Sequence, residues 1–161
     1  MDKEKIIKNS RLALTLLGFP RLFKHPTMLK NAKQEYDNIK ADGGEIDQLY
    51  DSLPYVLTND DKSNLRHPYA NAKFIRKYPE NFVKDLGNYK EVNDILEGKG
   101  WDDTKSDLIN NQYGLELGKQ YINAPNEIIF TNLLEHFGLP VMPLNGILHG
   151  YETFTEGIDR R

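Results

Sequence analysis

Apolar side chains recur along the chain with the three- and four-residue spacing of helices that bury one face. The clearest stretch begins at Pro26, which suits the first turn of a helix, and ends at the Gly43-Gly44 pair. Its apolar positions are Met28, Leu29, Ala32, Tyr36 and Ile39. The alternation of apolar and polar residues that marks a half-buried strand never persists for five residues. The sequence therefore predicts an all-α fold, a compact multi-helix domain of about seven helices with an irregular C-terminal arm.

Glycine and proline separate the expected helices. Gly18 and Pro20 end the first helix, and Gly138 and Pro140 end the last. Pro68 lies inside a helical stretch, so a helix there is expected to begin near Pro68 or to bend at it. The expected helical stretches are 1–17, 26–42, 46–53, 62–78, 80–86, 89–96, 103–121 and 127–137.

One domain is expected, because 161 residues fall within the usual size of a single domain. This domain spans residues 1–137, with basic N-terminal helices over 1–42 and a motif-bearing core over 62–122. Residues 138–161 combine prolines and glycines with many apolar side chains. They are expected to form an extended C-terminal arm that lies along the helical body or a neighbouring subunit, since an apolar segment is a poor solvated tail.

Positive charge is concentrated near the N-terminus. Residues 1–40 carry a formal charge of +5 and residues 41–161 carry −8, for a net charge of −3. The basic part could meet a phosphate surface or an acidic face of another protein, or it could be a solvated helix face. Nucleic acid is not expected as a partner, because dedicated nucleic-acid binders usually carry a basic patch in a basic domain.

Several classes of protein are excluded by what the sequence lacks. The chain has no cysteine, which excludes disulfides, thiol catalysis, iron–sulfur clusters and cysteine-bound zinc. No apolar run approaches the roughly 20 residues of a membrane span. No signal peptide is expected, because Asp2 and Glu4 lie where a basic region would be and no small-residue cleavage site follows. The sequence leaves the localisation open.

Two segments place polar side chains on one face of a helix. His67 and Asn71 are four residues apart, and so are Asp107 and Asn111, so each pair shares a face. One explanation is a buried polar network between helices, which specifies a single packing when every group is paired. A metal or acid–base site and a contact with a ligand or partner are the alternatives. The expected network comprises Arg66, His67, Asn71, Asp107, Asn110 and Asn111.

Gly114 and Gly118 continue the same face as Asp107 and Asn111. Each glycine lowers helix stability by roughly 1 kcal/mol relative to alanine, so the helix is expected to gain something from their small size. We expect another helix to cross at these two positions, where leucine would collide and alanine would be tolerated better.

These segments resemble an uncharacterised all-helical domain family of bacterial toxin-like and phage proteins. The family pattern runs R-H-x-x-W-N-A, then G-D-A-H-E, then D-L-H-N-N-x-x-G-x-x-x-G. Residues 66–72 (RHPYANA), 87–91 (GNYKE) and 107–118 (DLINNQYGLELG) are similar to its three parts in order and rough spacing. The resemblance covers about residues 63–120, and its third part is the most specific.

Two departures from the family pattern bear on chemistry. Lys90 and Ile109 stand where the family has histidine. The family's set of His, Glu and Asp side chains would suit a divalent metal or acid–base work. With two histidines missing, no resident metal ion or cofactor is expected here, and any catalytic role would fall to His67, Glu91 and Asp107.

The resulting interpretation is a non-enzymatic interaction or assembly protein, a phage virion-associated component, with protein partners in a larger assembly. The alternative is a small metal-dependent or acid/base-dependent hydrolase that acts on lipid or cell-wall material. The sequence leaves the question of enzymatic activity open and leans against it, because two histidines of the pattern are replaced.

Overall fold

The computed structural model describes residues 2, 4, 18–51 and 59–139, and these residues form seven α-helices and no strand. The predicted all-α class is therefore confirmed. The expectations for the first helix, for residues 52–58 and for the C-terminal arm from residue 140 lie outside the described residues. The helices are α2 (Pro20–Phe23), α3 (Pro26–Lys40), α4 (Glu45–Asp51), α5 (Asn59–Ile75), α6 (Glu80–Leu96), α7 (Trp101–Gln120) and α8 (Asn126–His136).

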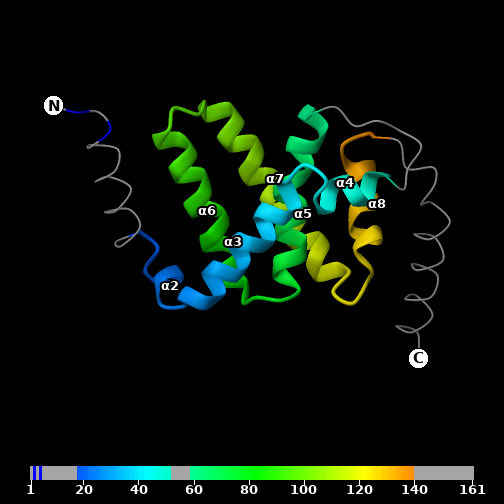
Figure 1. Cartoon of the computed structure of the whole chain (residues 1–161), viewed down its shortest axis with the longest axis horizontal. Helices are drawn as coiled ribbons and strands as arrows, with labels where there is room; N and C mark the ends of the chain where they lie inside the picture. Colours follow the sequence, from blue (N-terminus) through cyan, green and yellow to red (C-terminus); the bar gives the residue numbers. More distant parts are fainter. Residues whose placement is uncertain (1, 3, 5–17, 52–58, 140–161) are drawn as a thin grey trace.

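Helix α5 is the centre of the fold. It contacts α3, α4, α6, α7 and α8, and its most extensive contact is with α7. Figure 1 shows α6 on one side of α5 and α4 and α8 on the other, with α7 passing α5 obliquely from the α6 side toward α8. None of the described helices is both long and apolar enough to span a bilayer. The side chains of α5 that enter the core are Leu65, Tyr69, Ala70, Ala72 and Phe74.

The backbones of α5 and α7 approach each other closely at Gly114 and Gly118. A Cβ atom on Gly114 would overlap the carbonyl oxygen of Pro68 and lie 2.7 Å from its Cα atom. A Cβ atom on Gly118 would overlap the carbonyl oxygen of Ala72 and lie 2.8 Å from its Cα atom. The crossing predicted from the sequence is present, and it is tighter than expected, because even the methyl group of alanine has no room.

Helix α5 does not begin near Pro68. It begins at Asn59 and continues past the proline to Ile75. Proline lacks the N–H group of a regular helical hydrogen bond, which ordinarily disfavours the interior of a helix. Pro68 is buried, and the packing of α5 on five other helices compensates for the lost bond.

Two other helix boundaries differ from the sequence prediction. The separate stretches 80–86 and 89–96 form the single helix α6, which passes through Gly87. Gly87 has no positive φ and lies against the side chains of Asn71 and Asn111, so it is a packing position and not a helix end. Helix α7 begins at Trp101, two residues before the expected start, and the Trp101 side chain is 68% exposed.

The α5–α7 crossing yields a stability prediction. Gly114→Ala and Gly118→Ala should each lower the free energy of unfolding by about 1–3 kcal/mol, because overpacking against a backbone outweighs the gain in helix propensity. Denaturant unfolding followed by circular dichroism measures this change.

Gly87→Ala is the matched control, because a Cβ atom there meets nothing closer than 3.5 Å. It should leave stability unchanged or raise it by up to about 1 kcal/mol. Equal stabilisation by all three substitutions would show that α5 and α7 do not pack as described.

A candidate histidine–carboxylate site beside a pocket

Three residues from three different helices meet at one point. His67 comes from α5, Glu91 from α6 and Asp107 from α7, and one ligand atom from each lies within 4.8 Å of the others. His67 Nδ1 is 3.9 Å from Glu91 Oε1, and His67 Nε2 is 4.0 Å from Asp107 Oδ2. The structure thus brings together the three side chains that the sequence marks as the candidates for chemistry.

Glu91 is the most deeply buried of the three. The residue is 2% exposed, and its Oε1 atom has no hydrogen-bond partner among the described residues. Burial raises the pKa of the Glu91 carboxyl, while the ammonium group of Lys99 acts in the opposite direction. One oxygen of a buried carboxyl group therefore faces His67 without a donor.

Lys99 lies in the loop between α6 and α7 and joins the carboxylates of this region. Its Nζ atom is 3.1 Å from Glu91 Oε2 and 3.4 Å from Asp94 Oδ2, and it also donates to Asp107 Oδ2. Sequence reasoning missed this residue. The one local feature is its place between Gly98 and Gly100, and Gly98 has a positive φ of 100°.

His67 is a neutral imidazole at physiological pH. Its side chain is 14% exposed. Burial and the nearby positive charge of Lys90 lower its pKa to about 4, and the attraction of Asp107 for the charged form only partly opposes them. A neutral imidazole can accept a proton or bind a metal ion.

Asn71 and Asn111 connect α5 to α7 below His67. Asn71 Nδ2 donates to Asn111 Oδ1 at 2.9 Å and to the backbone oxygen of His67 at 2.9 Å. Of the remaining members of the predicted network, Arg66 and Asn110 are half-buried, and neither joins these bonds in the described part of the chain. The hydrogen-bonded connection between α5 and α7 therefore involves fewer residues than the sequence predicts.

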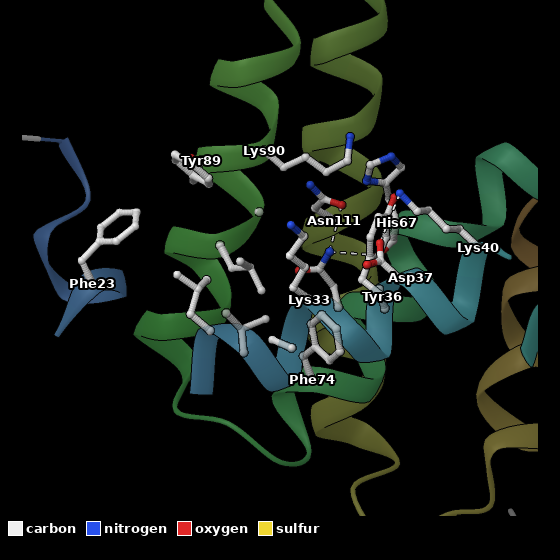
Figure 2. Close-up of a pocket in the computed structure, with 17 residues that line it drawn as sticks. Phe23, Lys33, Tyr36, Asp37, Lys40, His67, Phe74, Tyr89, Lys90 and Asn111 are labelled. Carbon is white, nitrogen blue, oxygen red and sulfur yellow. Dashed lines mark hydrogen bonds and ion pairs between the residues drawn. The ribbon is translucent and has the colours of Figure 1, made fainter. Parts of the chain in front are cut away.

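A pocket of about 410 Å³ opens between α3, α5 and α6. Its polar end includes Asn71, and Figure 2 shows His67, Lys90 and Asn111 there. Helix α3 also lines the pocket with polar side chains, which are Lys33, Tyr36, Asp37 and Lys40. His67 lines the pocket and also faces Glu91, so its imidazole ring lies between the cavity and the carboxyl group. The apolar lining includes Leu29, Ala32, Ala70, Phe74, Val83 and Leu86.

Only one of the two departures from the family pattern lies at the cluster. Ile109 is 59% exposed on α7, so the isoleucine removes no ligand atom from the cluster. Lys90 lines the polar end of the pocket, and its Nζ atom pairs with Asp94 Oδ2 at 2.7 Å. The replacement of a histidine by Ile109 is therefore no argument against chemistry at His67, Glu91 and Asp107.

Comparison with known proteins found no matching family model, no matching curated protein and no matching solved structure. The resemblance over residues 63–120 therefore stays a prediction, and the functional argument comes from the geometry of the site.

The depressed pKa of His67 predicts acid sensitivity. Between the unfolded value of 6.5 and the folded value of about 4, the unfolded chain binds more protons at His67 than the folded chain. The free energy of unfolding should therefore fall as the pH drops through this range, by up to about 3 kcal/mol from this residue. The raised pKa of Glu91 acts in the opposite sense, since the folded state takes up that proton more readily.

The contribution of His67 is isolated by comparing the protein with its His67→Gln variant, both in EDTA. Denaturant unfolding at pH 7 and pH 4 should show a smaller acid loss in the variant by about 2–3 kcal/mol. The control is His136→Gln, because His136 is exposed on α8. An identical acid loss in the protein and in His67→Gln would mean that His67 is not held neutral by burial.

Proposed function

We propose that the protein is a small hydrolase whose reacting groups lie at the His67 end of the pocket. The observation that carries this proposal is the buried Glu91 carboxyl, with a free oxygen that faces a neutral imidazole at the wall of a cavity. Ionisable groups with perturbed pKa values beside a concave, largely apolar cavity are characteristic of active sites.

The chemistry of the pocket indicates an ester of lipid-like character as the substrate class. Its apolar lining would hold an acyl chain, and the ammonium group of Lys33 would attract an anionic head group. Lys40 would add to this attraction less, because its Nζ atom lies 3.4 Å from Oδ1 of Asp37, which also lines the pocket. The scissile bond would then lie at the polar end, beside His67 and Lys90. The cluster would accept a proton from a water molecule, whose oxygen would attack the carbonyl carbon of the ester, and Lys90 would stabilise the negative charge on the carbonyl oxygen. The C–O bond to the alcohol would then break, and the proton held by the cluster would pass to the leaving alcohol oxygen, which yields a carboxylic acid and an alcohol.

Hydrolysis of p-nitrophenyl acetate, butyrate and octanoate tests this proposal. The octanoate ester should be turned over with a higher kcat/KM than the acetate ester, because its chain fills the apolar part of the pocket. His67→Ala and Asp107→Asn should each lower kcat/KM by about 100-fold or more, as expected for groups that act in the transition state. Circular dichroism confirms that each variant is folded.

His136→Ala is the matched control and should keep full activity, because this histidine lies on the surface and stacks on Tyr113 instead of facing the pocket. Activity that survives in His67→Ala, or no activity with any of the three esters, would contradict the proposal.

A second candidate function is the assembly role, within a phage particle or another multi-protein complex. Three apolar side chains on α7 are solvent-exposed, at 68% for Trp101, 36% for Leu108 and 59% for Ile109. Helical spacing places them within one sector of α7, where they could pack against another protein.

Size-exclusion chromatography with light scattering should then show self-association that the double substitution Trp101→Ser/Ile109→Ser abolishes. A monomer at all concentrations would count against self-assembly.

A further inference from the structure

We propose that His67, Glu91 and Asp107 bind a divalent transition-metal cation of the Zn²⁺ or Mn²⁺ type, and that Lys99 holds the site in the metal-free protein. This inference rests on the proposed hydrolytic function and deepens it, because it names the group that would activate water there. It stands on the donor set, on the unpartnered oxygen of Glu91 and on the position of the Lys99 ammonium group.

The donor set suits such a cation. A neutral imidazole nitrogen and two carboxylate oxygens are common zinc ligands, and three protein ligands leave a further coordination position for water. Metal–ligand bonds of about 2.0–2.2 Å place neighbouring ligand atoms about 3–3.5 Å apart. One imidazole nitrogen and one carboxylate oxygen from each of Glu91 and Asp107 lie within 4.8 Å of one another. These atoms would have to draw closer together to bind one ion through a single nitrogen of His67.

The unpartnered oxygen of Glu91 is an independent observation that points to a ligand at this position. A buried carboxylate oxygen without a donor is costly, and native proteins normally pair such atoms. Glu91 Oε1 lies in the cluster and faces His67, while Oε2 of the same carboxyl group is bonded to Lys99. A cation between Glu91 and His67 would satisfy the free oxygen. A bound water molecule is the competing explanation, and the experiment below separates the two.

Lys99 places a positive charge next to the proposed metal position. Its Nζ atom joins Glu91 and Asp107, the two carboxylate ligands. The residue lies between Gly98 and Gly100, and its side chain is 21% exposed. Rotation of this side chain toward solvent would free both carboxylates without moving α6 or α7. Lys99 and a metal ion would then compete for the same oxygens, and the ammonium group would lower the apparent affinity for the ion.

If Lys99 and a metal ion compete for the same oxygens, removal of the lysine should raise the affinity for the ion. A purely structural ion pair predicts no such gain. Isothermal titration of the full chain with ZnCl₂ and with MnCl₂, after treatment with EDTA, should show one ion bound per chain for at least one of the two salts. Lys99→Met should bind that ion about 10-fold more tightly or better, because the competing charge is gone. A gain in affinity cannot come from a failure to fold.

Substitution of the proposed ligands should weaken binding of the ion. His67→Ala and Asp107→Asn should each weaken binding of the ion at least 10-fold, both alone and combined with Lys99→Met. His136→Ala should bind as the unmodified protein does, which separates the cluster from surface histidines. If neither the protein nor Lys99→Met binds Zn²⁺ or Mn²⁺ more tightly than His67→Ala, the site is no metal site, and water satisfies Glu91.

The metal titration and the ester assay can fail independently of each other. One ion bound at the cluster, without hydrolysis of the p-nitrophenyl esters, would contradict the hydrolase and leave the metal site standing. Ester hydrolysis that depends on His67 but persists in EDTA, with no ion bound, would overturn the metal site and leave the hydrolase standing.

Discussion

Helices α5 and α7 pack backbone against backbone, and the polar site is arranged around this contact. Gly114 and Gly118 allow the two backbones to touch at Pro68 and Ala72. With the helices held at this separation, the amide groups of Asn71 and Asn111 reach each other at 2.9 Å. Further along the same two helices, His67 and Asp107 come to 4.0 Å. The glycines lower the intrinsic stability of α7, and what they provide is the geometry of the polar site.

The charge balance of the site depends on the loop between α6 and α7. Glu91, Asp94 and Asp107 bring three carboxyl groups into a small volume, and Lys99 contacts all three. Like charges at such distances repel each other, and a neighbouring cation offsets this repulsion. The protein supplies a cation, Lys99, from a short, glycine-flanked loop outside the helices. If the proposed metal ion binds, this side chain would turn to solvent without any change in α6 or α7.

Local signals account for the parts of the fold that the sequence predicts well. The helix from Pro26 is recognised from its proline start, its apolar spacing and the glycines after it, and the same holds for the helix that follows Pro125. Gly87 is misinterpreted as a helix end, because its role depends on two asparagines from other helices. The expectation that a helix begins near Pro68 is wrong for the same kind of reason, since packing from five helices outweighs the local effect of the proline. The alternative expectation, a bend at Pro68, stays a prediction.

The candidate site, like the fold, is predictable from the sequence only where local spacing carries the information. Spacing along single helices identifies the pairs His67–Asn71 and Asp107–Asn111, and the resemblance adds Glu91. The pocket and Lys99 are not predictable, because each depends on how separate helices are placed in space.

A crystal structure of the zinc-soaked protein, with anomalous data at the zinc edge, would show whether a metal ion displaces Lys99 from the cluster. We expect an anomalous peak bound by His67, Glu91 and Asp107, with Lys99 turned to solvent. Zinc at surface histidines alone, with Lys99 still bridging Glu91 and Asp107, would rule out the proposed site.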